Sequence, residues 1–226
     1  MYSAPTPVVR MLLIINVAVF VFVTLPPVHL GIETPWVSLY QDMMLSYWTS
    51  PDFKEWTVFT HFFHHADLSH LFFNMLMLYF FGPVIEKTVG PQKFLALYFV
   101  AAAGAVALHT AEIWWQINNT PKVLTAYGNA PELSRMLGAS GAISGVLAAY
   151  AVFYPWQKLQ LLFIPVPVAA VYMIGGIFAL DLYMGVMDYG FDTTARFAHL
   201  GGGIAGALLA FAWKRTVSPP GVQRWN

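Results

Sequence analysis

The sequence has 226 residues, of which 58% are hydrophobic and 10% are charged. A soluble domain carries about 25% charged residues, so this composition is typical of a membrane protein. The formal net charge is zero, which gives no indication of a nucleic-acid partner. The chain has no cysteine, which excludes disulfides, thiolate catalysis and cysteine metal sites.

Several apolar runs approach the ~20 residues that a helix needs to cross the hydrocarbon core of a bilayer. In chain order, six such segments occupy residues 8–25, 68–85, 94–115, 140–154, 161–187 and 195–213. No linker or internal repeat divides them. The sequence therefore predicts an all-α, polytopic membrane protein in which residues 1–226 form a single six-helix domain, with residues 216–226 as a loose tail.

Local signals mark the ends of some of these helices. Asp67 is a suitable N-cap for the second helix, and Pro165 and Pro167 lie near the start of the fifth. The connection over residues 26–56 is rich in aromatic side chains, which favour the membrane–water boundary. We therefore expect this connection to lie along the interface.

Basic residues indicate the orientation, because cytoplasmic loops of membrane proteins are enriched in lysine and arginine. With the N-terminus in the cytoplasm, the basic residues on the cytoplasmic side are Arg10, Lys87, Lys93, Lys158, Lys214, Arg215 and Arg224. Those on the external side are Lys54, Lys122, Arg135 and Arg196. The sequence thus predicts that both termini are cytoplasmic.

Polar residues from three separate spans are expected at one depth of the membrane. With this topology the second, fourth and sixth spans all enter from the external side. His70 and Asn74 lie in the first two turns of the second span, Ser140 opens the fourth, and His199 lies in the first turns of the sixth. Ionisable groups inside spans are costly, so we interpret this set as a functional site.

Glycine spacing predicts which helices meet. Gly202 and Gly206 lie four residues apart, as do Gly141 and Gly145. Such pairs of small residues let helices approach closely in lipid. Packing of the fourth span on the sixth through these glycines would bring Ser140 within reach of His199.

A serine next to a histidine suggests nucleophilic catalysis, because a serine hydroxyl needs an adjacent base. His199 would take the proton of Ser140 and later pass it to the leaving amine. The oxyanion would be stabilised by the backbone N–H of Ser140, the amide of Asn74 and an N–H of His70. No acid is placed by sequence to orient His199. The candidates for that role are Asp181, Asp188 and Asp192, but a dyad is simpler.

Each of these residues also has a structural interpretation. The Gly-x-Ser-Gly segment is consistent with helix packing alone, His199 with an interhelical hydrogen bond, and the pair His70 and Asn74 with satisfying buried backbone groups. The histidines at 61, 64, 65 and 70 raise the possibility of zinc, but no carboxylate is placed as a further ligand, so we expect no metal. We interpret Glu86 as a structural group that caps the next turn of the chain.

Four motifs in this order resemble those of the rhomboid family of intramembrane serine proteases. They are His65-x4-His70-x3-Asn74, Gly82-x3-Glu86-x3-Gly90, Gly138-Ala139-Ser140-Gly141, and Ala198-His199-Leu200-Gly201-Gly202 continuing to Gly206. Each motif alone is weak, but the combination is highly specific. The resemblance extends over a motif core of about residues 56–213.

The resemblance implies a six-helix bundle in the lipid bilayer around a water-filled cavity, with Ser140 as nucleophile and His199 as base. His70, Asn74 and the Ser140 amide would form the oxyanion hole, and the remaining motif residues would have supporting roles. It implies a serine endopeptidase that cuts transmembrane protein substrates in or near their spans without a cofactor. A bacterial plasma membrane is suggested, with a processed organellar protein as the alternative.

Two positions depart from the family pattern. Thr57 follows Trp56 where many relatives have arginine, and Ser144 occupies a position one turn after the serine that is often aromatic. The alternatives to a protease are a silent client-binding protein and a transporter. A catalytically silent rhomboid-like protein that binds transmembrane clients usually lacks the serine or the histidine, and both are present. A transporter would show inverted repeats, which we do not find.

Overall fold

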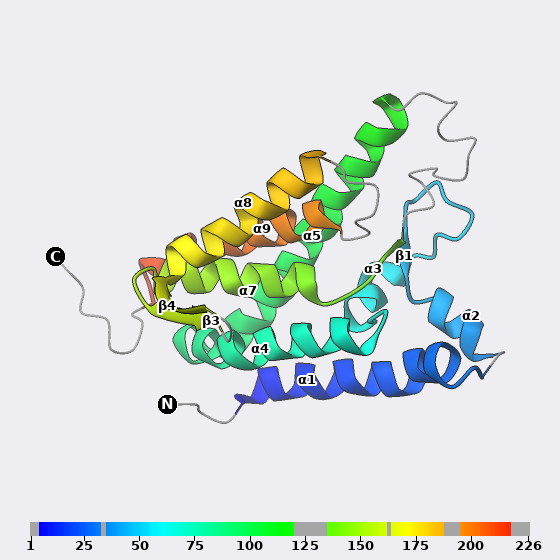
Figure 1. Cartoon of the computed structure of the whole chain (residues 1–226), viewed down its shortest axis with the longest axis horizontal. Coiled ribbons are helices and arrows are strands. Elements are labelled where there is room, and N and C mark those ends of the chain that lie inside the picture. The colour runs from blue at the N-terminus through cyan, green and yellow to red at the C-terminus, as the bar shows by residue number, and fades with distance from the viewer. Residues whose placement is uncertain (1–4, 33–34, 120–134, 162–163, 188–194, 218–226) are drawn as a thin grey trace.

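The computed structural model describes residues 5–32, 35–119, 135–161, 164–187 and 195–217. Within these ranges the chain forms one bundle of long helices (Figure 1). They are α1 (Pro7–Val19) continued by the π-helix η1 (Phe20–His29), α4 (Leu68–Val89), α5 (Pro91–Asn119), α7 (Ser140–Phe153), α8 (Ala170–Met187) and α9 (Arg196–Lys214). The first turn of α1 and the last turn of α9 lie at the same end of the bundle (Figure 1).

The predicted all-α membrane fold is confirmed. Among the described residues, four helices are long and apolar enough to cross a membrane: Pro7–Val28, Leu68–Val89, Pro91–Asn119 and Ala170–Met187. The helix α7 is shorter, about 21 Å at ~1.5 Å per residue. It packs against α4, α5, α8 and α9, and 11 of its 14 residues are buried. Because protein covers it on several sides, α7 contributes to the core of the bundle more than to its lipid-facing surface.

The first span is longer than predicted. The helix passes through Pro26 and Pro27 and ends at His29, in a π-helical form. Proline lacks the N–H needed for the α-helical ladder, and wider turns accommodate such interruptions. The backbone N–H of Leu30 accordingly donates to the carbonyl of Leu25, five residues earlier, over 3.1 Å.

The predicted start of the fifth helix is wrong. A hairpin of β3 (Lys158–Leu161) and β4 (Ile164–Ala169) precedes α8, which begins only at Ala170. Pro165 and Pro167 fall in β4. Proline inside a helix removes a backbone hydrogen bond, whereas an edge strand tolerates it, and both strands of a two-stranded sheet are edges.

The connection after the first span is ordered by contacts with the segment that precedes α7. It contains α2 (Trp36–Gln41), β1 (Leu45–Ser46), α3 (Thr57–Thr60) and the 3-10 helix η2 (His61–Phe63). The strand β1 pairs antiparallel with β2 (Arg135–Met136).

Hydrogen bonds fix the rest of this connection. The backbone N–H of Gly138 donates to the carbonyl of His61 over 2.9 Å. Trp56 Nε1 donates to the carbonyl of Asp42 over 3.0 Å, and the fully buried Thr57 donates from its hydroxyl to the carbonyl of Lys54. The hydroxyl of Thr57 therefore helps to hold the loop in its observed conformation.

Glu86 has a structural partner, but a different one from that predicted. Its carboxylate, 3% exposed, accepts hydrogen bonds from the Thr6 hydroxyl and from the backbone N–H groups of Val8 and Val9. It therefore caps the start of α1, where helical N–H groups have no partner within the helix. The expected cap on the following turn is wrong because the true partner is nearly 80 residues distant in sequence, which no local pattern reveals.

The helices α7 and α9 meet through glycine backbones. A Cβ atom at Gly202 would lie 1.9 Å from the carbonyl oxygen of Gly141, and one at Gly206 would lie 2.4 Å from the Cα of Gly145. Only glycine permits this approach. The glycine pairs singled out by their spacing are therefore the pairs that face each other.

We expect Gly202→Ala to destabilise the protein, because the added methyl group would force α7 and α9 apart. Overpacking of this kind costs about 1–3 kcal/mol. The measurement is the thermal unfolding midpoint of the detergent-purified protein. Gly175→Ala on α8 is the matched control, because a Cβ there meets nothing within 4 Å. An unfolding midpoint of Gly202→Ala at or above that of the control would contradict the close contact.

Candidate active site

Ser140 is the first residue of α7, and a sharp turn at Gly138 precedes it. Gly138 has a φ of 113°, a conformation that glycine adopts readily and other residues rarely adopt. A Cβ atom at this position would lie 2.7 Å from the His70 ring. The glycine therefore permits both the turn into α7 and the close approach of His70.

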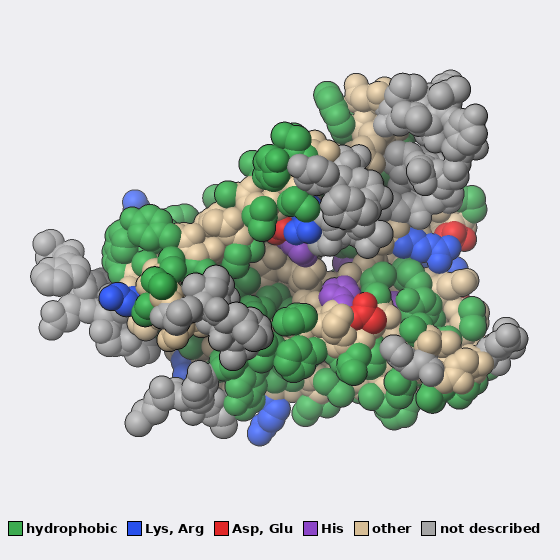
Figure 2. Space-filling model, in the orientation of Figure 1, with side chains coloured by type: hydrophobic (Ala, Val, Ile, Leu, Met, Phe, Trp, Pro, Cys, Tyr) green, Lys and Arg blue, Asp and Glu red, His purple; other side chains and the backbone are tan. Residues whose placement is uncertain are grey.

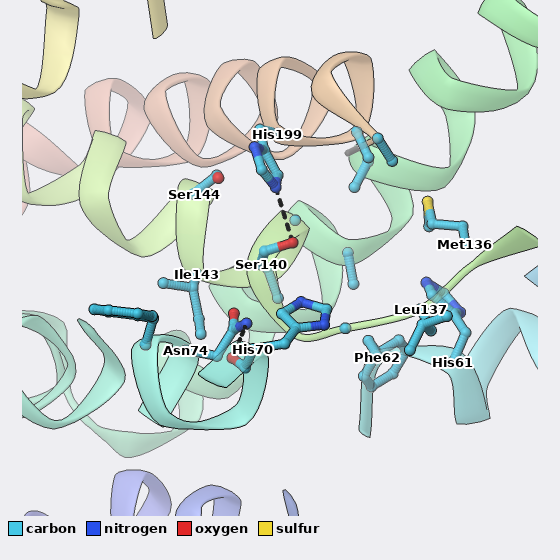
Figure 3. Close-up of a pocket in the computed structure, with 18 of the residues that line it drawn as sticks. His61, Phe62, His70, Asn74, Met136, Leu137, Ser140, Ile143, Ser144 and His199 are labelled. Atoms are coloured by element: carbon cyan, nitrogen blue, oxygen red, sulfur yellow. Dashed lines mark hydrogen bonds between the residues drawn. The ribbon is translucent and has the colours of Figure 1, made fainter. Parts of the chain in front are cut away.

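The side chains of Ser140 and His199 are hydrogen-bonded. His199 Nε2 lies 2.9 Å from Ser140 Oγ, although the two residues are 59 positions apart in sequence. Figure 3 shows the His199 ring pointing from α9 toward Ser140 at the start of α7. This is the distance over which an imidazole accepts a hydroxyl proton.

His70 and Asn74 lie on the first turns of α4, on the other side of Ser140 (Figure 3). The predicted N-cap is confirmed, since Asp67 Oδ1 accepts a hydrogen bond from the backbone N–H of His70 over 2.8 Å. Asn74 Nδ2 donates to the carbonyl of His70, also over 2.8 Å. A side-chain amide has two hydrogens, so this bond leaves one donor of Asn74 for another acceptor.

All of these side chains line one cavity of about 640 Å³. Its polar wall comprises His61, Asp67, His70, Asn74, Arg135, Ser140, Ser144, Asp181 and His199. In Figure 2 histidine and acidic side chains are visible in a hollow in the middle of an otherwise largely hydrophobic face. Polar side chains from the second, fourth and sixth predicted spans thus line the same cavity.

A carboxylate that the sequence left unassigned completes the arrangement. Asp181 on α8 is 4% exposed, and its Oδ2 lies 3.1 Å from His199 Nδ1. Its Oδ1 accepts from Arg196 Nη1 over 2.7 Å. The other acids considered, Asp188 and Asp192, lie outside the described residues. Helical spacing alone did not distinguish Asp181, because the phase of α8 relative to α9 depends on tertiary packing.

Histidines in the segment before α4 are buried and neutral. Burial lowers the pKa of His61 and of His64 to about 4, and that of His65 to about 3. His61 Nδ1 lies 2.7 Å from the carbonyl of Thr57, and the His64 ring packs edge-on against Tyr40. Among the described residues, no three His, Asp or Glu side chains converge as metal ligands. His65 supports the site by packing its ring edge-on against His70.

Comparison with known proteins identifies the family. The family model for the rhomboid domain matches residues 52–216, which is more than half of the chain. This chain belongs to the rhomboid family. Rhomboids include serine proteases, and the match covers all four motifs and every residue of the site described above.

Three similar proteins illustrate the range of the family. RHOMBOID-like protein 12, mitochondrial, of Arabidopsis thaliana is 34% identical over 70% of this chain and 46% of its own length. Rhomboid protein 1, mitochondrial, of Saccharomyces cerevisiae is 32% identical over 94% of this chain and 55% of its own length. Rhomboid protease AarA of Providencia stuartii is 30% identical over 66% of this chain and 52% of its own length.

The chain thus spans about half the length of these curated relatives. Two of the three are mitochondrial by name, so the comparisons do not support the bacterial plasma membrane that the sequence suggested. The membrane location itself is supported by the family and by the apolar helices. The orientation of the termini stays a prediction.

The buried histidines predict a loss of stability in acid. The pKa of His64 is about 4 in the folded protein and about 6.5 in an unfolded chain, so the unfolded state binds more protons between these values. The free energy of unfolding therefore falls as the pH drops below about 6.5. At pH 5 each such histidine costs about 2 kcal/mol.

The measurement is the thermal unfolding midpoint at pH 7.5 and at pH 5. His64→Phe removes the titrating group while keeping a ring against Tyr40, and neither ring nitrogen of His64 has a hydrogen-bond partner among the described residues. We expect a smaller difference between the two pH values for this variant than for the parent protein. An unchanged difference would show that His64 is not a source of the acid sensitivity.

Proposed function

We propose that this rhomboid is an intramembrane serine endopeptidase that cleaves transmembrane protein substrates in or near their membrane spans. The observation that supports this most strongly is the 2.9 Å contact between Ser140 Oγ and His199 Nε2 inside a polar cavity of a membrane bundle. In this proposal Ser140 is the nucleophile and His199 is the general base.

The reaction follows from the contact. His199 Nε2 takes the hydroxyl proton as Ser140 Oγ attacks the scissile carbonyl carbon. The resulting imidazolium passes the proton to the leaving amine, and an acyl-enzyme forms as the C–N bond breaks. Water then attacks the acyl carbon while His199 takes its proton, the ester bond to Ser140 Oγ breaks, and His199 returns the proton to that oxygen as the carboxylate product leaves.

The oxyanion would be stabilised from two directions. The backbone N–H of Ser140 lies at the N-terminus of α7, where the helix dipole favours negative charge. The second amide hydrogen of Asn74 and an N–H of the His70 ring lie on the opposite wall of the same cavity. Donors of this kind act on the charge that develops in the transition state.

The substrate class is supported by where the polar groups lie along the helices. Ser140 is the first residue of α7, His70 the third of α4 and His199 the fourth of α9. At ~1.5 Å of rise per residue, the site lies within about one turn of these helix ends. A peptide bond near the end of a substrate's span would reach this depth, where water can also enter.

Ser140→Ala should abolish cleavage of a model transmembrane substrate, because Ser140 is the side chain that contacts His199 Nε2 in the part of the chain that the structure describes. A fluorophosphonate should label the parent protein, and neither Ser140→Ala nor His199→Ala. Ser144→Ala, one turn further along α7, is the matched control and should still be labelled. Equal cleavage by the parent protein and Ser140→Ala would end the protease proposal and favour a silent, client-binding rhomboid.

Asn74→Ala should lower kcat by ~10²-fold or more, as removal of other oxyanion donors does. The matched control is Asn118→Ala on α5, because Asn118 Nδ2 donates to the carbonyl of Trp114 in the same i to i−4 pattern. The control removes an equivalent helix hydrogen bond but no donor in the cavity. A change in kcat within twofold for Asn74→Ala would remove Asn74 from the oxyanion hole.

A further inference from the structure

Three side chains from three helices form a continuous hydrogen-bonded series in the cavity. Ser140 Oγ on α7 meets His199 Nε2 on α9 at 2.9 Å, and His199 Nδ1 meets Asp181 Oδ2 on α8 at 3.1 Å. We propose that Asp181 is a positioning residue that orients His199, so that the site works as a Ser-His-Asp series rather than a dyad. This inference rests on the proposed protease function.

The carboxylate determines the tautomer of His199. A carboxylate ion only accepts hydrogen bonds, so the ring nitrogen that faces it, Nδ1, must carry the hydrogen. The other nitrogen, Nε2, then has a free lone pair, and this is the atom that faces Ser140 Oγ. The tautomer that the reaction needs is therefore the one that Asp181 selects.

The charge of Asp181 is balanced within the structure. A buried carboxylate is costly unless it is paired and hydrogen-bonded. Both oxygens of Asp181 are engaged, Oδ2 by His199 and Oδ1 by Arg196 Nη1. Arg196 thus favours the ionised carboxylate, and the imidazolium that forms when His199 takes a proton faces a negative charge.

The position of Asp181 is fixed by packing on either side along α8. A Cβ atom at Gly203 would lie 2.5 Å from the Phe178 ring, and one at Gly185 would lie 3.0 Å from the Phe197 ring. Phe178, Asp181 and Gly185 are spaced three and four residues apart, so they share one face of α8. The carboxylate is thereby held against α9 by contacts one turn before it and one turn after it.

The residue one turn after Ser140 makes this assignment more specific. That residue is Ser144, which is buried and has no ring to pack against His199. The orientation of the His199 ring is accordingly set by hydrogen bonds at both nitrogens.

The test compares two variants that each break one bond of the same carboxylate. Asp181→Asn keeps the shape but presents an amide to His199, whereas Arg196→Gln breaks the ion pair and leaves the bond to His199. We expect kcat to fall ~10²-fold or more in Asp181→Asn with KM changed less than about threefold. The corresponding change in serine proteases with a Ser-His-Asp triad lowers kcat by about 10⁴-fold.

Arg196→Gln should lower kcat by less than about tenfold, and Asp181→Glu should recover part of the activity lost in Asp181→Asn. Equal losses of kcat in Asp181→Asn and Arg196→Gln would overturn the inference, because they would reduce Asp181 to one half of an ion pair between helices. Unfolding midpoints of all variants should be measured, so that kcat refers to folded protein.

A spectroscopic readout separates this inference from the protease proposal. The hydrogen between His199 Nδ1 and Asp181 Oδ2 should give a strongly deshielded one-proton NMR signal in the parent protein and in Ser140→Ala and Arg196→Gln. It should be absent from Asp181→Asn and His199→Ala. Persistence of the signal in Asp181→Asn would refute the assignment. If the parent protein and Ser140→Ala cleave equally, the protease proposal fails, and the signal still decides whether Asp181 orients His199.

Discussion

The close backbone contact between α7 and α9 is the constraint on which the site depends. Lipid provides no hydrophobic force between helices, so their association relies on packing and interhelical hydrogen bonds. Gly141 faces Gly202, and Gly145 faces Gly206, with no side chain between the backbones. Ser140 is followed directly by Gly141 in α7, and His199 lies two residues before Gly201 in α9. Their hydrogen bond is therefore possible because the axes of α7 and α9 lie so close together.

A series of hydrogen-bonded polar side chains then connects this pair to α8, the least buried of the four candidate spans among the described residues. Only 17% of the most apolar 18-residue stretch of α8 is buried, against 33–39% of the corresponding stretches in the other three candidate spans. Asp181 is nevertheless 4% exposed and bonded to two side chains of α9. The one acidic residue of α8 thus joins a largely lipid-facing helix to the centre of the cavity.

Much of the fold and the site could be predicted because the signals are local. The six apolar segments, the N-cap Asp67 and the glycine spacing each reflect short-range geometry, and the helices expected from them are present. The shared depth of the polar residues and the glycine spacing indicated Ser140 and His199, and the family motifs agreed with that choice. The β3–β4 hairpin was missed because a short apolar run with prolines fits either a strand or a helix end. The partners of Glu86 were missed, and Asp181 stayed one of three candidates for the acid beside His199, because these contacts depend on tertiary packing between separate segments.

The pairing of β1 with β2 connects the loop after the first helix to the segment that leads into Ser140. Leu45 pairs with Met136, four residues before Ser140, and a hydrogen bond from Gly138 to His61 adds a second tie two residues further on. Displacing this loop would pull on the segment that leads from β2 into Ser140 at the start of α7. A molecule bound to the outer surface of this loop would therefore have a short mechanical route to the contact between Ser140 and His199.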